Sequence, residues 1–287
     1  MNGEDTFFKR SQDMTIKGQI FNMSKPLVMG IINITPDSFH AASRATNALE
    51  ACELAEKQLS QGASFLDLGA ISTRPGAPVV SPEEEKKRLL PVLALLVKTF
   101  PEAIISVDTF NAEIAKASIE AGAAIINDVT GGEGDQQMLS TVAKLNCPYI
   151  AMHSRGNSLT MTELTQYNKL PDDIIKWFAE KIKKYTEAGI HDIIVDPGIG
   201  FAKNAEQNFT IIDHLNDFKI LEKPILMGIS RKRFIYNTLN IPVENSLNGT
   251  TAMHMACLMN GANILRVHDV KEAIETVQLF LQMKKSR

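Results

Sequence analysis

Short apolar runs rich in valine and isoleucine recur along the chain, and longer segments with helical periodicity separate them. This alternation predicts parallel strands that are joined by crossover helices. The predicted strands span residues 27–32, 64–68, 104–107, 124–127, 149–152, 193–195, 224–227 and 263–267. Eight such strand and helix units are the number that closes a barrel. We therefore expect an α/β protein with a single (β/α)8 TIM barrel.

A short β-hairpin is predicted before the first barrel strand. Residues 14–22 form two short polar and apolar stretches around Lys17 and Gly18, a pair suited to a tight turn. We expect this hairpin to cover the bottom of the barrel. The sequence contains no linker that would mark a second domain, so it divides into an extension with the hairpin (1–24) and the barrel (25–287).

Composition and charge restrict the classes of partner. The chain has 287 residues, 44% of them hydrophobic, which is enough to bury the core of one large barrel. Its formal net charge of -3 provides no broad basic field for nucleic acid or an anionic membrane, so small molecules are the expected partners. The polar start and the lack of a run near the roughly 20 apolar residues of a membrane span argue against secretion and insertion.

Cysteine usage indicates the compartment. The three cysteines, Cys52, Cys147 and Cys257, are far apart, show no paired spacing for a metal, and leave one thiol over in any disulfide pairing. This pattern favours a reducing environment, and we expect a cytoplasmic protein.

Polar and charged residues follow nearly every predicted strand. The carboxyl ends of all eight strands meet at one mouth of a barrel, so these residues become neighbours. Any one of them has an ordinary explanation as a turn residue, a helix cap or a solvated charge. Together they are costly to bury unless they bind a polar ligand, which predicts an active site at this mouth. They include Asn33, Asp37, Asp67, Arg74, Asp108, Asn127, His153, Asp196, Ser230, Lys232, Arg266 and His268.

The residue types at the mouth indicate what they bind. Asp108, Asn127 and Asp196 provide acceptors and one amide, which suit a flat heterocycle with several N–H groups on one edge. Ser230 begins the predicted helical segment after the seventh strand, with Lys232 beside it. A helix N-terminus attracts anions, so a carboxylate of a second substrate is expected there.

A second group of residues is suited to an anion with a metal ion. Arg74, Arg266 and His268 provide donors and positive charge, and Asn33 provides an amide oxygen. This combination fits a pyrophosphate with one hard cation, for which Mg²⁺ is the natural choice. We therefore expect Asn33 to be the metal ligand of the chain.

Several motifs of the chain resemble those of the dihydropteroate synthase family. They are MGIINITPDSF, STRPGA, INDVTGG, VDPGIGFAKN, GISRKRF and RVHDV, in the order and spacing of the family, and they cover nearly the whole chain after about Lys25. GISRK followed by RVHDV is the most specific pair. The resemblance implies a magnesium-dependent transferase of folate biosynthesis that joins 6-hydroxymethyl-7,8-dihydropterin pyrophosphate to 4-aminobenzoate and releases pyrophosphate.

The resemblance also implies roles for individual residues. The pterin would be bound by Asp108, Asn127, Asp196 and Lys232, and the pyrophosphate by Asn33, Arg74, Arg266 and His268. The aminobenzoate would be bound by Thr73, Pro75, Phe201 and Ser230. The implied catalytic residues are Asp108, Asp37 and Lys232, with both carboxylates near a cation that forms when pyrophosphate leaves. The family further implies a homodimer through the last helices and a sulfonamide target.

Two departures from the family pattern concern the first two loops. The chain reads His40 to Ser43 where the family usually has a glycine pair, and Ala70-Ile71 where it often has Gly-Glu. Neither change removes a proposed ligand, so they bear on how these loops close and not on the chemistry.

Three alternatives stay open from the sequence. His153 is either a buried structural histidine or a ligand. The nearest enzymatic rival is a methyltetrahydrofolate-dependent corrinoid methyltransferase barrel, which has no pyrophosphate for Arg266 and His268 to bind. A non-catalytic pterin-binding protein would have little need for the complete set of polar residues.

Overall fold

The barrel strands follow the predicted order along the chain. The computed structural model describes residues 13–34, 48–72, 76–77 and 80–286. The strands of the barrel are β3 (Leu27–Asn33), β4 (Phe65–Gly69), β5 (Ile105–Asp108), β6 (Ile125–Asp128), β7 (Tyr149–Met152), β8 (Ile193–Asp196), β9 (Leu226–Met227) and β10 (Ile264–Val267). A separate pair, β1 (Asp13–Ile16) and β2 (Gln19–Asn22), precedes them.

The pairing of these strands closes a barrel. Within the described ranges, the sheet has eight strands in the order β8-β7-β6-β5-β4-β3-β10-β9, and its ladders are parallel. An isolated parallel bridge between Val195 and Ile225 joins its two edges. The predicted (β/α)8 barrel is therefore confirmed, and only short edges remain.

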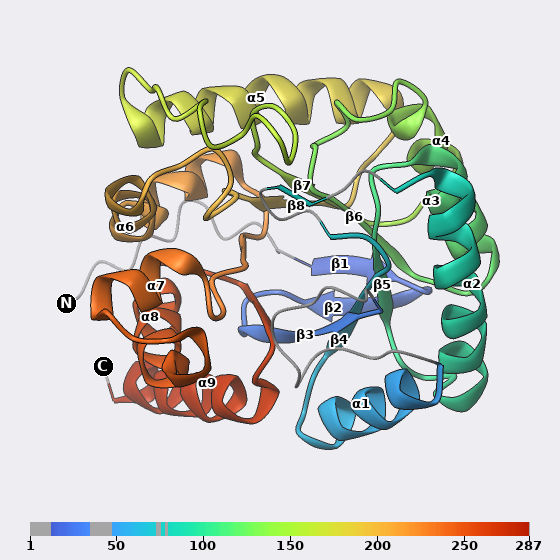
Figure 1. Cartoon of the computed structure of the whole chain (residues 1–287), viewed down its shortest axis with the longest axis horizontal. Helices are drawn as coiled ribbons and strands as arrows, with labels where there is room; N and C mark the ends of the chain where they lie inside the picture. Colours follow the sequence, from blue (N-terminus) through green and yellow to red (C-terminus); the bar gives the residue numbers. More distant parts are fainter. Residues whose placement is uncertain (1–12, 35–47, 73–75, 78–79, 287) are drawn as a thin grey trace.

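The helices form an outer ring around the sheet, as Figure 1 shows. They are α1 (Ala48–Ser60), α2 (Pro82–Thr99), α3 (Ala112–Glu120), α4 (Met138–Leu145), α5 (Leu170–Ala188), α6 (Ala205–Asp213), α7 (Arg233–Leu239), α8 (Leu247–Met259) and α9 (Val270–Lys285), with short 3-10 segments at Leu215–Leu221 and Val243–Asn245. Among the described helices, none combines the length and apolar character that a membrane span needs.

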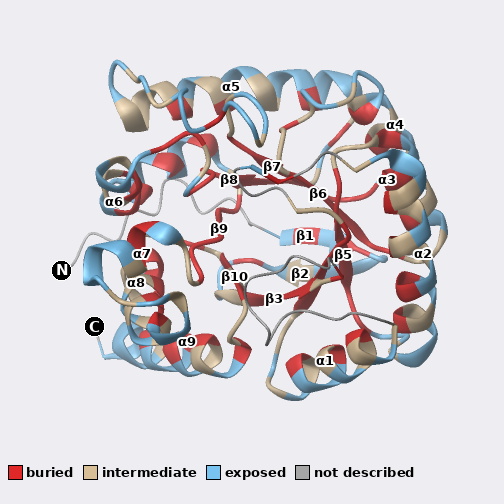
Figure 2. Ribbon diagram, in the orientation of Figure 1, coloured by how far each residue is buried: buried red, intermediate tan, exposed pale blue. Residues whose placement is uncertain are grey.

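The alternation of side chains along each strand divides the core in two. Outward-facing residues such as Val28, Leu66 and Val107 belong to a large cluster with the inner faces of the helices. Inward-facing residues near the strand starts, such as Phe65 and Ile150, form a second cluster inside the barrel. Figure 2 shows the strands as mainly buried and the outer faces of the helices as exposed. This division leaves the inward positions near the strand ends for polar residues.

The hairpin closes the bottom of the barrel. Its turn has positive φ at Lys17 (49°) and Gly18 (73°), the requirement of a type I′ turn between antiparallel strands. Met14 and Ile16 are buried in the inner cluster, together with Met23 just after the hairpin. Figure 1 shows the hairpin within the ring of helices. The predicted position of the hairpin is therefore confirmed, and any ligand must enter from the opposite end.

Several strand limits differ from the prediction by about one residue. β3, β4, β5, β6 and β8 each include the polar or glycine residue that follows the apolar run. Parallel ladders pair backbone groups, so they continue through residues whose side chains do not favour a strand. The predicted strand at 224–227 is shorter, because only Leu226 and Met227 form β9.

Candidate active site

The inward positions at the carboxyl ends of the strands carry polar side chains. Asn33 lies at the end of β3, Asp67 inside β4, and Asp108 at the end of β5. Asn127, Asp196 and Arg266 occupy the equivalent region of β6, β8 and β10. Residues from six strands are thus brought to one mouth, as the sequence predicted from their positions after apolar runs.

Asp67 connects two of these residues. Its Oδ2 accepts a hydrogen bond from Asn127 Nδ2 at 3.0 Å and a second from Arg266 Nε at 2.6 Å. Asp67 is fully buried. Because one N–H of the Asn127 amide donates to Asp67, the orientation of the amide is fixed, and its Oδ1 can accept from a ligand. The sequence assigned no role to Asp67, although a carboxylate at an inward strand position was a signal of one.

Arg266 balances the buried carboxylates. Its Nη2 donates to Asp108 Oδ2 at 3.0 Å, in addition to its bond with Asp67. Burial alone would lower the pKa of Arg266, but Asp67 and Asp108 raise it. Burial raises the pKa of Asp108 to about 7, against the influence of Arg266. Among the described residues Asp108 Oδ1 has no hydrogen-bond partner, which leaves a buried acceptor at the mouth.

Asp196 and Lys232 influence each other's pKa. Burial raises the pKa of Asp196, and Lys232 opposes this shift. Burial lowers the pKa of Lys232 to about 8, and Asp196 opposes it. Lys232 Nζ donates to the carbonyl of Ile199 and lies 4.7 Å from the centroid of the Phe201 ring. The structure therefore brings Phe201, predicted for the second substrate, beside Lys232, predicted for the first.

Asn33 and Asp108 face each other across a glycine. Gly69 pairs with Asn33 on one side and with Asp108 on the other. A Cβ at Gly69 would lie 3.6 Å from Asn33 Oδ1 and 3.6 Å from Asp108 Cβ. The missing side chain keeps the space between the two oxygen donors open. Groups of three or more histidine, cysteine, aspartate or glutamate residues suited to a metal do not occur among the described residues.

Ser230 and His268 lie in contact. The backbone N–H of His268 donates to Ser230 Oγ at 3.2 Å, and His268 Nδ1 lies 3.0 Å from the same oxygen. One expectation for Ser230 was wrong, because α7 begins at Arg233 with Lys232 as its N-cap, and Ser230 precedes the helix. The reason is local, since Arg231 adopts the left-handed conformation with φ 52° and interrupts the helical turn.

Arg231 stabilises the arrangement of Ser230 and His268. Its Nε and Nη2 donate to the two carboxylate oxygens of Asp269 at 2.8 and 2.9 Å. Such a two-pronged ion pair holds both partners in a defined orientation. Each partner is adjacent in sequence to a predicted ligand, Ser230 or His268, so the pair sets the distance between them. The sequence did not assign this role to Arg231.

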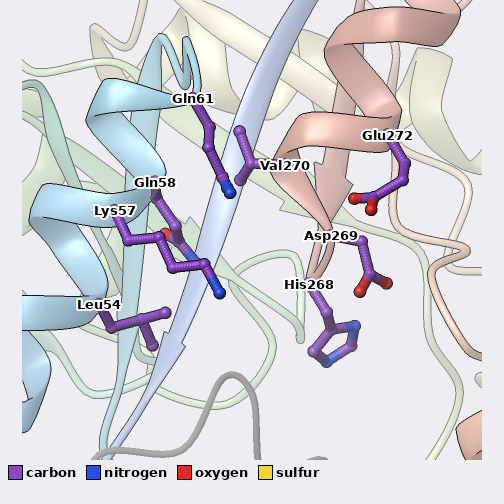
Figure 3. A pocket seen from close by; sticks show the side chains of 8 residues that line it. All are labelled: Leu54, Lys57, Gln58, Gln61, His268, Asp269, Val270 and Glu272. Carbon is purple, nitrogen blue, oxygen red and sulfur yellow. The ribbon is translucent and has the colours of Figure 1, made fainter.

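A small polar cavity lies beside His268, between α1 and α9. Figure 3 shows side chains from the two helices facing one another across it. The residues that line it are Leu54, Lys57, Gln58, Gln61, His268, Asp269, Val270 and Glu272. It shares His268 with the mouth of the barrel, but its other residues lie outside the ring of strand ends.

His153 is a structural histidine. It is buried with 1% of its surface exposed, and its ring lies 5.0 Å from that of Trp177 in an edge-on arrangement. Its Nδ1 lies 3.0 Å from Nζ of the buried Lys203. Burial, and to a lesser degree Lys203, lower the pKa of His153 to about 2, so the ring is neutral. The alternative that His153 is a ligand is not supported, because protein groups surround the ring.

Four predicted site residues lie outside the described residues. They are Asp37 in the first loop and Thr73, Arg74 and Pro75 in the second. The altered stretch from His40 to Ser43 lies outside them as well, whereas Ala70 is described and buried.

The chain is similar over most of its length to known enzymes. Residues 29–268 match the family described as pterin binding enzyme. The dihydropteroate synthase of Escherichia coli K12 is 37% identical over 265 residues, which are 92% of this chain and 93% of the relative. The chain belongs to the dihydropteroate synthase family of pterin-binding enzymes. The family resemblance of its motifs is thereby confirmed.

Solved structures of the dihydropteroate synthase family have the same architecture. The Yersinia pestis dihydropteroate synthase, in complex with a sulfonamide drug, has a TM-score of 0.91 and 37% identity and covers 95% of this chain and 99% of its own. The Xanthomonas albilineans enzyme with 4-aminobenzoic acid has a TM-score of 0.88 and 34% identity, with coverage of 96% and 99%. The whole barrel of this chain, not one segment of it, therefore follows the dihydropteroate synthase family.

Proposed function

We propose that this chain is a transferase that joins 6-hydroxymethyl-7,8-dihydropterin pyrophosphate to 4-aminobenzoate, giving 7,8-dihydropteroate and pyrophosphate. The observation that carries the proposal is the network of Asp67, Asn127, Arg266 and Asp108 at the mouth of a barrel of this family. It offers fixed acceptors for a heterocycle beside a fixed cation for an anionic leaving group. A corrinoid methyltransferase or a non-catalytic binding protein would not need both the acceptors for the heterocycle and the cation for the leaving group.

The pterin is bound by acceptors that the protein has already oriented. Asn127 Oδ1 and the buried Oδ1 of Asp108 have no competing donor among the contacts given above, and Asp196 uses its Oδ1 to accept from Gly198 N–H at 2.7 Å. The second oxygen of Asp196 then pairs with N–H groups of the ring, while Lys232 donates to a ring acceptor. A buried acceptor that a ligand satisfies contributes on the order of 1–3 kcal/mol to binding selectivity.

The reaction begins with loss of pyrophosphate from the pterin methylene carbon. Arg266 and His268 bind the departing anion, and Arg74 supports it from the second loop. Asp108, with Asp37 of the first loop, stabilises the cation that remains on the pterin. The aromatic amine attacks the methylene carbon while neutral, and the resulting ammonium then loses one proton to water, so the step needs no strong base. Thr73, Pro75, Phe201 and Ser230 hold the aminobenzoate in line with the methylene carbon.

We also assign Mg²⁺ as the cofactor, with Asn33 as its protein ligand. Asn33 Oδ1 is a hard oxygen donor beside Asp108, and the open space over Gly69 separates the two residues. Mg²⁺ prefers such oxygen donors together with waters and substrate phosphates, so this donor set fits the ion. When bound, Mg²⁺ neutralises charge that develops on the leaving pyrophosphate.

The biological unit is proposed to be a homodimer that forms through the last helices. Leu279 and Met283 of α9 and Met259 of α8 expose 64%, 44% and 36% of their surface. Exposed apolar side chains on the last two helices are suited to burial against a second copy. Light scattering should give twice the mass of the chain, and Leu279→Glu with Met283→Glu should give one copy.

The three cysteines form no disulfide, which supports a cytoplasmic location.

One assay tests the function. Purified protein with Mg²⁺ and the pterin pyrophosphate should release pyrophosphate and form dihydropteroate when 4-aminobenzoate is added, and a sulfonamide should compete with the aminobenzoate. Removal of Mg²⁺ with a chelator should abolish turnover. Methyl transfer from methyltetrahydrofolate, without dihydropteroate formation, would replace this function with that of the rival barrel. Pterin binding without turnover would leave a binding protein.

A further inference from the structure

Lys203 is a buried lysine that folds back into its own loop. It follows β8 at the end of residues 197–203 and exposes 8% of its surface. Its Nζ donates to the carbonyls of Gly198 at 3.0 Å and Phe201 at 2.9 Å, and it lies 3.0 Å from His153 Nδ1. The His153 carbonyl, 3.4 Å away, is a fourth acceptor, so each of the three N–H donors of the ammonium group has a partner within reach. Burial lowers the pKa of Lys203, whereas the Asp196 carboxylate opposes this shift.

The loop that Lys203 closes has an unusual backbone. Gly198, Gly200 and Ala202 have φ values of 72°, 81° and 50°. A left-handed conformation at Ala202 is unfavourable for a residue with a Cβ, so other contacts must stabilise it. Lys203 provides these contacts from inside the loop, and Tyr167 donates from outside to the Ala202 carbonyl at 3.0 Å. The curled form is therefore stabilised by these side-chain donors in addition to the hydrogen bond that the Phe201 N–H donates to the Gly198 carbonyl at 3.1 Å.

The same loop positions two proposed substrate ligands. It carries Phe201, and it provides the Ile199 carbonyl that accepts from Lys232. The Lys232 ammonium also lies over the Phe201 ring. The contacts of Lys232 with the Ile199 carbonyl and with the Phe201 ring are thus both made with the loop whose shape Lys203 maintains. His153 follows the last residue of β7, so its contact with Lys203 joins the loop to the end of that strand.

We propose that Lys203 is a positioning residue that sets the places of Phe201 and Lys232 and thereby the affinity for the arylamine substrate. The proposal rests on the proposed function. Lys203 is buried with its ammonium bonded to its own loop and His153, so it acts through the loop. Its loss should move the Phe201 ring and the Lys232 ammonium together, which weakens arylamine binding more than it slows the chemical step.

The test compares Lys203→Met, which keeps the length and removes the donors, with the wild-type enzyme. KM for 4-aminobenzoate should rise about tenfold or more, because small displacements of a positioning group have effects of this size. The value of kcat should fall by a smaller factor. A merely structural role would reduce the amount of active enzyme, which lowers kcat and leaves KM unchanged. Lys98→Met, at an exposed position of α2, is the matched control and should leave both constants unchanged.

Two further measurements keep the result interpretable. Trp177, the chain's one tryptophan, lies against His153, so its fluorescence should change in Lys203→Met and not in Lys98→Met. If Lys203→Met does not fold, Lys203→Gln, which retains two N–H donors, should show a smaller rise of the same KM. An unchanged aminobenzoate KM in the folded variant would overturn the proposal. Failure of the wild type to form dihydropteroate would instead overturn the proposed function.

Discussion

Arg266 Nε donates to Asp67 Oδ2 across 2.6 Å, although 199 positions separate the two residues in the chain. Asp67 also accepts from Asn127, so one buried carboxylate orients a residue proposed to bind the pterin and another proposed to bind the pyrophosphate. The side chains proposed to bind the pterin and the pyrophosphate are thus both hydrogen-bonded to Asp67.

Asp67→Asn should destabilise the protein and weaken binding of both halves of the substrate. The substitution leaves the half-buried Arg266 with Asp108 as its remaining carboxylate partner among those described. Breaking a buried ion pair typically costs 3–5 kcal/mol, and we expect about 3 kcal/mol here, since Asp108 still faces Arg266. Urea unfolding measures this loss. Asp172→Asn, which removes a surface pair with Lys169, should change stability little. Equal effects of the two substitutions would show that Asp67 is not an anchor.

The pH dependence of kcat/KM should be bell-shaped. Asp108 acts as a carboxylate, so activity should rise as pH increases through its pKa of about 7. Lys232 acts as an ammonium, so activity should fall as pH increases through its pKa of about 8. Lys232→Arg keeps its charge over the whole accessible pH range because a guanidinium does not lose its proton in proteins, so the falling limb that comes from Lys232 should disappear, while limbs from substrate ionisation stay in position. A falling limb at the same pH in both enzymes would exclude Lys232 as its source.

Asp196→Asn should weaken pterin binding at least several-fold. Asp196 Oδ1 already accepts from Gly198 N–H, and the second oxygen is proposed to accept from the ring. An amide places a donor opposite a donor on one of these sides, a buried mismatch of about 1–3 kcal/mol. Titration calorimetry with a pterin measures the effect, and Asp213→Asn on the exposed end of α6 is the control. Full affinity in a folded Asp196→Asn protein would remove Asp196 from the pterin site.

Gly198→Ala should cost more stability than Gly18→Ala, although both glycines have nearly the same φ of 72° and 73°. A Cβ at Gly18 meets no atom within 4 Å, so that substitution costs about 1–2 kcal/mol from the left-handed backbone alone. A Cβ at Gly198 would lie 2.0 Å from the His153 carbonyl oxygen, and overpacking of this kind adds about 1–3 kcal/mol. Chemical denaturation of the two variants gives the difference directly. Equal losses would mean that the loop after β8 yields to the added methyl group.

The sequence alone determined the architecture and the side of the barrel on which ligands bind. Hydrophobic period fixes which residues of a strand face the helices, and eight repeats of strand and helix close a ring. The turn at Lys17-Gly18 predicted the hairpin because its conformational requirement is local. Asp108, Asn127, Asp196 and Arg266 were found for the same reason, since a polar residue that ends an apolar strand of such a barrel reaches its mouth.

Only the tertiary structure decided how these residues are paired. Asp67 looked like any carboxylate at a strand end, and its contacts with Asn127 and Arg266 depend on side-chain distances across residues far apart in the chain. Lys203 looked like a solvated lysine after a turn, but its side chain folds into the loop, where it donates to the carbonyls of Gly198 and Phe201. Hydrogen bonds depend on distances of a few tenths of an ångström, which residue order does not encode locally and which only the closed barrel sets.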